Sequence, residues 1–162
     1  MAQFTTNATR SDPYKNFRFR VKWDGRYVAG VSKVSGLKRT TEMVEHREGG
    51  DPSSAGKSPG RTKYEPITLE RGVIHDAEFQ QWVQGFIRGS VAAVTRENLR
   101  KDMTIELYDG AGHVVAGYTV LGGRVSKYVG PDLNADATDV AIEELTLEHR
   151  GCECDRKEES VA

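Results

Sequence analysis

Apolar and polar residues alternate in several short segments of this chain, and this alternation constrains its fold more than any other feature. Residues 16–23 are the clearest case: Phe17, Phe19, Val21 and Trp23 are apolar, and the positions between them are basic. Because successive side chains of a strand point to opposite faces, this pattern predicts a half-buried β-strand. Similar patterns predict further strands at 27–37, 66–71, 103–108, 113–128 and 140–149. The chain is therefore expected to be mainly β.

One helix is predicted, over residues 76–88. Its apolar residues recur with helical spacing and form a single stripe, which is typical of a helix that packs against a core. Asp76 or His75 can begin it, and Gly89 can end it. The residues expected to pack in the core are Phe17, Phe19, Phe79, Trp82, Phe86, Ile105 and Leu145.

The segment 39–48 has some strand propensity, but it is polar on both parities. A strand of this kind must project from the core or line a surface that is wetted on one side and contacted on the other. The segment 49–63, which follows, is rich in Gly, Pro and Ser and is expected to be a long loop. Long loops in small domains are usually functional or disordered.

Length and charge limit the function classes. A chain of 162 residues predicts one domain, here 15–150, with a flexible arm at 1–14 and a polar tail at 151–162. Its 23 basic and 24 acidic residues give a net charge of −1, which argues against a nucleic-acid binder that works through an overall basic field. No apolar run is long enough to span a membrane, and the first residues do not resemble a secretory signal. The protein is therefore expected to be soluble and to fold in the cytoplasm.

Catalytic patterns are weak. The segment 50–58 resembles a phosphate-binding loop, but it has five residues between its glycines where the motif needs four, and Pro59 follows at once. His149, Cys152 and Cys154 form a possible three-ligand metal cluster, although a structural zinc site needs a fourth ligand. We expect no catalytic residue, no metal and no cofactor. Two alternatives stay open: a monomeric β-barrel that binds a small ligand, and a metal-dependent enzyme that uses these three residues.

Seven segments together resemble one protein family. They are 12–19 (DPYKNFRF), 31–38 (VSKVSGLK), 57–69 (KSPGRTKYEPITL), 71–79 (RGVIHDAEF) with Trp82, 100–108 (RKDMTIELY), 131–136 (PDLNAD) and 140–148 (VAIEELTLE). In order and spacing the chain resembles the T4-type tail tube proteins of contractile phages, and most closely the inner tube proteins of phage-tail-like contractile injection systems. The resemblance covers about residues 12–150.

The resemblance implies a β-barrel or split β-sandwich with one flanking α-helix. It implies a structural protein without catalytic activity, whose hexameric rings stack into a hollow tube that contraction of a sheath drives through a target envelope. The implied partners are further copies of the chain, the sheath protein, baseplate or hub proteins, tube-terminating proteins and effector cargo in the lumen. Membrane insertion and specific nucleic-acid binding are not expected. Assembly would occur in the cytoplasm. The assembled chain would be a component of a virion or of a phage-tail-like particle that can be released.

Three sets of residues are predicted to serve assembly. The loop 49–63 is expected to contact the neighbouring ring, where its basic residues would meet carboxylates from the segment 42–48. On strand 140–149, the parity opposite to the core is expected to line the lumen as acidic rings, with the sheath-facing side as the competing prediction. The ring-stacking residues are Lys57, Pro59, Arg61, Lys63 and Tyr64; the inter-subunit strand carries Glu42, Val44, Glu45 and Arg47; and the lumen-facing residues are Glu144, Thr146 and Glu148.

Overall fold

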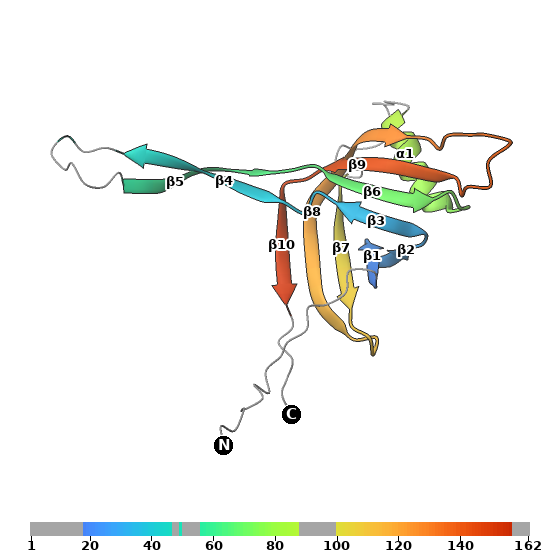
Figure 1. Ribbon diagram of the computed structural model, residues 1–162, viewed down its shortest axis with the longest axis horizontal. Coiled ribbons are helices and arrows are strands. Elements are labelled where there is room, and N and C mark those ends of the chain that lie inside the picture. The colour runs from blue at the N-terminus through green and yellow to red at the C-terminus, as the bar shows by residue number, and fades with distance from the viewer. Residues whose placement is uncertain (1–17, 47–48, 50–55, 88–99, 157–162) are drawn as a thin grey trace, which may run out of the picture.

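The structure is a computed structural model, and it describes residues 18–46, 49, 56–87 and 100–156. Within these residues the chain forms one helix and antiparallel strands (Figure 1). In chain order the elements are β1 (Phe19–Trp23), β2 (Arg26–Val28), β3 (Val31–Ser35), β4 (Arg39–His46), β5 (Gly56–Tyr64), β6 (Ile67–Gly72), α1 (Ala77–Ile87), β7 (Lys101–Tyr108), β8 (Val114–Val129), β9 (Ile142–Glu148) and β10 (Gly151–Arg156). The predicted arm at 1–14, Phe17 and Arg47 lie outside the described residues.

The long strand β8 joins two sheets. Its first part pairs with β7 on one side and β10 on the other, and its second part, from Arg124 to Val129, pairs with β9. One sheet therefore runs β2-β1-β7-β8-β10 and the other β8-β9-β6-β3. The strand changes sheets at Gly122, which has a φ of +61°, a conformation that glycine adopts without steric cost. This architecture confirms the expected mainly-β split sandwich with one helix.

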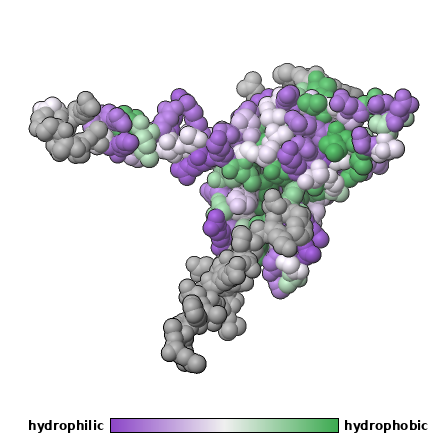
Figure 2. Space-filling model, in the orientation of Figure 1, coloured by the Kyte–Doolittle hydropathy of each residue, from purple (hydrophilic) through white to green (hydrophobic). Residues whose placement is uncertain are grey.

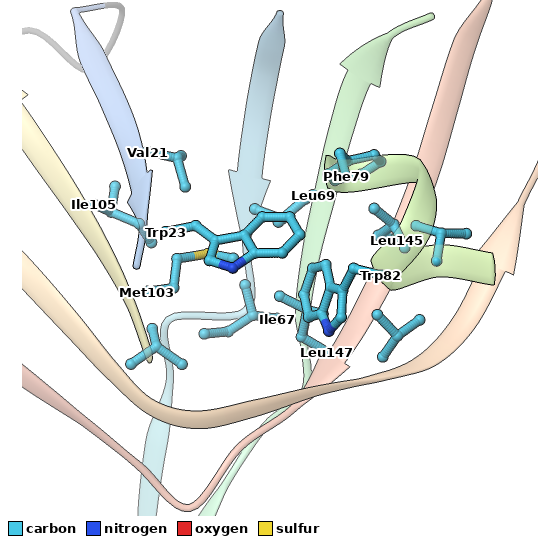
Figure 3. Close-up of a cluster of buried hydrophobic side chains, with 13 residues drawn as sticks. Val21, Trp23, Ile67, Leu69, Phe79, Trp82, Met103, Ile105, Leu145 and Leu147 are labelled. Carbon is cyan, nitrogen blue, oxygen red and sulfur yellow. The ribbon is translucent and has the colours of Figure 1, made fainter. Parts of the chain in front are cut away.

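The core lies between the two sheets and under α1. Ile67, Val120 and Leu147 are fully buried there. Two tryptophans from distant parts of the chain, Trp23 and Trp82, meet with their ring centroids 4.1 Å apart (Figure 3). Of the residues expected in the core, Phe79, Trp82, Ile105 and Leu145 are buried, and Phe19 and Phe86 are partly buried against the same cluster.

The helix α1 is held at its start by Asp76. Its carboxylate accepts a hydrogen bond from the backbone N–H of Phe79 at 3.3 Å, and its carbonyl accepts one from Gln80. This is an N-cap, which satisfies backbone donors that have no partner inside the helix. Ile87, at the other end of the predicted stripe, is 53% exposed. No helix in the described part of the chain is long and apolar enough to cross a membrane.

Three predicted elements are corrected. The expected strand 27–37 is two strands, separated at Gly30, which has a φ of +77°. The prediction of a loop over 49–63 was wrong for residues 56–63, because these residues belong to β5, which pairs with β4. The polar tail 151–162 also contains a strand, because residues 151–156 form β10 against β8. In both of the last two cases the pairing partner, and not the local sequence, determines the strand.

Candidate assembly surfaces

Strands β4 and β5 form a two-stranded hairpin that extends from the body of the molecule (Figure 1). Almost all of its residues are exposed on both faces. Near its base, Thr41 and Thr62 are paired across the strands, and their hydroxyls lie 3.1 Å apart. A hairpin that packs on no other element is at best marginally stable in water. The polar pattern of this segment is thus explained by the hairpin, which projects from the body of the molecule. Projection from the core was one of the two arrangements that the sequence allowed.

The charges of the hairpin are partly neutralised within it. Lys63 Nζ lies 2.6 Å from Glu42 Oε1, and Lys57 Nζ lies 3.8 Å from Glu45 Oε1. The prediction that these carboxylates meet the basic residues of a neighbouring ring stays a prediction, and within the single chain they pair with basic residues of the same hairpin. Arg61 is exposed and forms no ion pair with a residue that the structure describes.

Exposed apolar side chains lie along the hairpin as well. Met43 is 61% exposed and pairs in register with Pro59, and Val44 is 45% exposed. The register shifts between Thr41 and Met43, so that a bulge interrupts the ladder near Pro59. Proline lacks a backbone N–H and is tolerated in a strand at such an irregularity.

The base of the hairpin is tightly held by the body. Gly36 has a φ of +88°, and a Cβ at this position would lie 2.1 Å from the carbonyl oxygen of Pro66. Tyr64 contacts His149, with ring centroids 5.6 Å apart, and packs against Gly151. His149 Nε2 lies 2.9 Å from the carbonyl oxygen of Glu65. These contacts set the direction in which the hairpin leaves the body.

Strand β10 is paired on one side, with β8, and no described strand pairs with its other edge. Such an edge is a template for another strand. Its two thiols, at Cys152 and Cys154, are free, and burial raises the pKa of Cys152. No group of three or more metal-binding side chains occurs among the described residues, and His149 is engaged at the hairpin base.

The predicted lumen residues lie on the face of β9 that points away from the core. Glu144 and Thr146 are half-buried and Glu148 is exposed, whereas Leu145 and Leu147 between them are buried. Glu144 pairs in register with Glu70, whose carboxylate binds Lys33 at 2.8 Å. These residues therefore occupy the face of β9 that the sequence assigned to them. Whether that face lines the lumen stays a prediction.

A buried charged cluster was not predicted. Arg71 is 2% exposed and Glu143 is 9% exposed. Arg71 Nε lies 3.3 Å from Glu143 Oε1 in an ion pair without hydrogen-bond geometry, and an Arg71 Nη lies 3.5 Å from Asp76. The Tyr128 hydroxyl donates to Glu143 at 3.1 Å. The sequence did contain a signal for it. Arg71 and Glu143 stand at core-facing positions of β6 and β9, and the other core-facing residues of these strands are apolar.

A second unpredicted cluster covers the outer face of β1, β2 and β7. The Glu106 carboxylate accepts from Tyr108 at 2.6 Å and from Lys22 at 2.9 Å, and Tyr27 approaches it at 3.2 Å. Arg20 lies over the rings of both tyrosines. Burial raises the pKa of Glu106, but the hydrogen bonds from Tyr108 and Lys22 together outweigh it, so that the pKa lies below its usual value.

Between the sheets, buried side chains such as Val21, Val120 and Leu145 pack together in one hydrophobic cluster. A hollow of about 780 Å³ lies instead beside α1 and the β1–β2 turn, with charged and aromatic walls that include Asp24, Lys101 and Trp82. The ligand-binding barrel expected as an alternative would need an enclosed apolar cavity. No described feature favours it.

Comparison with known proteins agrees with this geometry. Among curated protein sequences, none matches the chain significantly. Among solved structures, the chain is similar to one in the anti-feeding prophage tube-terminating cap, with a TM-score of 0.78 and 22% identity over 97% of this chain and 100% of that one. It is also similar to a chain of the PVC extracellular contractile injection system sheath–tube complex, with a TM-score of 0.75 and 23% identity over 96% of this chain and 100% of that one. A chain in the PVC sheath/tube terminator has a TM-score of 0.75 and 25% identity, with coverages of 90% and 99%.

These structural similarities establish the fold. The family described as T4-like virus tail tube protein gp19 matches residues 15–153, which include nearly every described element. Because this match covers most of the sequence, the chain belongs to the T4-like virus tail tube protein family.

Proposed function

We propose that this chain is the structural subunit of the inner tube of a contractile injection system or contractile phage tail, without catalytic activity of its own. Hexameric rings of the chain stack into a hollow tube, which sheath contraction drives through a target envelope. The projecting hairpin is the observation that carries this proposal. Its strands are exposed on both faces and contact the body only at their base, so their stable position in a folded protein requires a partner.

Within a ring, edge strands supply the contacts between neighbours. The free edge of β10 offers unpaired backbone groups along a strand that is otherwise fully formed. Joining such edges around a closed ring removes exposed edges, which otherwise promote aggregation. The hairpin, with Lys57, Arg61 and Lys63, then forms the axial contact between rings.

The partners follow from the same proposal. The similar structures include a sheath–tube complex, a sheath/tube terminator, a tube-terminating cap and a baseplate. They support a sheath protein around the tube, a baseplate below it and a terminating protein above it. Effector proteins are the proposed cargo, and assembly takes place in the cytoplasm before any release of the particle.

Glu144, Thr146 and Glu148 are proposed to face the lumen. Six copies would form acidic rings that discourage anionic cargo from adhering, an effect that salt screens. The competing arrangement places these residues against the sheath. A density map of an assembled ring decides between them, because the outer wall and the bore are unmistakable at the level of β9.

Electron microscopy of the purified chain tests the function directly. The wild-type chain is compared with a variant in which residues 42–61 are replaced by Asn-Gly. This replacement keeps the base of the hairpin, including the Thr41–Thr62 pair, and closes it with a favoured two-residue turn. The variant is expected to fold, with a cooperative thermal unfolding transition, and to form rings that do not stack.

Two results would count against the proposal in different ways. Tubes of normal length from the shortened variant would exclude the hairpin as the axial contact. A wild-type chain that stays an 18.0 kDa monomer at every concentration and salt would exclude the tube itself.

A further inference from the structure

The hairpin needs a binding site on the next copy, and the loop between β8 and β9 has the properties of one. This loop, 130–141, lies at the end of the molecule opposite to the one from which β4 and β5 project (Figure 1). A contact between unlike surfaces at opposite ends of one chain is heterologous and repeats head to tail, as stacked rings require. This inference therefore rests on the proposed function.

The loop is ordered by its own contacts. Its Asn134 accepts backbone hydrogen bonds from Asp136 at 3.0 Å and Ala137 at 3.2 Å. The carbonyl of Ala141 accepts from the backbone N–H of Val73 at 2.9 Å, which ties the loop to the end of β6. The loop thus presents a defined surface.

That surface is a hollow with apolar and acidic walls. It encloses about 450 Å³ and is lined by residues that include Asp132, Leu133, Asp139, Val140 and Ile142. Leu133 is 86% exposed and Val140 is 75% exposed. Figure 2 shows hydrophobic residues among polar ones at this end of the body. Exposed side chains of this size in one place indicate a contact surface.

The hairpin complements this hollow in charge and in polarity. Strand β5 carries three basic residues and no acidic one, whereas the loop 130–141 carries three aspartates and no basic residue. Of the basic residues, Lys57 and Lys63 are bound to carboxylates of β4, which leaves Arg61 available to another chain. Met43 supplies exposed apolar surface for Leu133 and Val140, whereas Val44, the next residue of β4, points to the other face of the hairpin.

We propose that the β4–β5 hairpin of one copy docks in the hollow of the 130–141 loop on a copy in the adjacent ring. Arg61 lies against Asp132 and Asp139, and Met43 covers Leu133 and Val140. The partner of this acidic, apolar hollow is a second copy of the same chain.

Charge reversal with rescue tests the pairing. The measured quantity is the concentration at which full-length chain forms tubes, determined by pelleting and negative-stain microscopy. Arg61→Glu alone and the pair Asp132→Lys and Asp139→Lys alone are each expected to raise it at least about tenfold, because like charges then face each other. Combining the three substitutions in one chain restores the opposite-charge contact and is expected to restore tubes.

Asp136→Lys is the matched control. It makes the same substitution in the same loop as each member of the Asp132 and Asp139 pair, but Asp136 does not line the hollow, so tubes are expected at the wild-type concentration. Unchanged thermal unfolding of each variant shows that the fold is intact, since the side chains of Asp132 and Asp139 are exposed.

The outcomes separate the two proposals. If the wild type forms tubes and the reversals in the hollow have no effect, or if the combined chain is not rescued, the docking site is wrong while the tube assignment stands. If the wild type forms no tubes under any condition, the proposed function fails, and this inference fails with it.

Discussion

At the scale of single residues, the least expected feature is a buried arginine. The Arg71 guanidinium lies 3.9 Å from the centroid of the Phe79 ring and between the carboxylates of Glu143 and Asp76. These groups come from β6, β9 and the start of α1, so Arg71 fastens the helix to the sheet. A buried ion pair contributes little net stability, but removing one partner leaves an uncompensated charge.

Replacing Arg71 with Met is expected to lower the free energy of unfolding by about 3–5 kcal/mol. Adding Glu143→Gln should return part of this loss, because the amide removes the buried charge and can still accept from Tyr128. Urea unfolding followed by tryptophan fluorescence measures both. Lys33→Met, which breaks the exposed pair with Glu70, is the control and should cause no comparable loss. An equal effect of Arg71→Met and Lys33→Met would show that the cluster does not hold the helix.

The carboxylate of Glu106 predicts a dependence of stability on pH. Its pKa in the folded protein is lowered, so the ionised form stabilises the fold above the pKa of the unfolded chain, about 4.3. This contribution is lost as the pH falls through the folded pKa. The difference in melting temperature between wild type and Glu106→Gln should therefore be present at pH 7 and shrink progressively as the pH falls below the unfolded pKa of about 4.3. A difference that stays constant between pH 7 and pH 3 would contradict this origin.

At the scale of elements, the base of the hairpin depends on one glycine. Gly36→Ala combines a left-handed backbone, which costs about 1–2 kcal/mol for a residue with a side chain, with a Cβ placed 2.1 Å from the Pro66 carbonyl oxygen. Gly25→Ala is the matched control, because Gly25 also has a positive φ but has no atom within 4 Å of a built Cβ. Chemical denaturation should show a larger loss of stability for Gly36→Ala. Equal losses would show that the backbone of 65–66 yields without cost.

At the scale of the whole molecule, stability is expected to be uneven. Among the described strands β4 and β5 pair only with each other, whereas β8 is paired on both sides and carries core residues such as Val120. In dissociated subunits, amides of β4 and β5 should exchange with deuterium early and those of β8 late. In assembled tubes the hairpin amides should become protected, and mass spectrometry of the two samples measures this. Hairpin amides that exchange as slowly as β8 in the free subunit would mean that the body stabilises the hairpin by itself.

The strands and the helix of the body were predictable because their signals are local. The alternation around Trp23 and the helical stripe through Trp82 are properties of a few neighbouring residues, and burial of one face follows from them. The family resemblance extended this to the architecture. The turn between β1 and β2 also depends on neighbouring residues alone, because Asp24 and Gly25 adopt the positive φ that a two-residue hairpin turn requires.

Residues 56–63 and 151–156 could not be predicted as strands, because their composition favours loops. Only pairing with β4 and β8 supplies the backbone hydrogen bonds that make them strands. The same holds for Arg71 and Glu143, whose pairing depends on the register of β6 with β9. The sequence alone therefore determined the fold class, the helix and the inward faces, which depend on local periodicity. The tertiary structure decided where the hairpin points, which charges meet and which surfaces remain for a partner, because these depend on contacts between segments far apart in the chain.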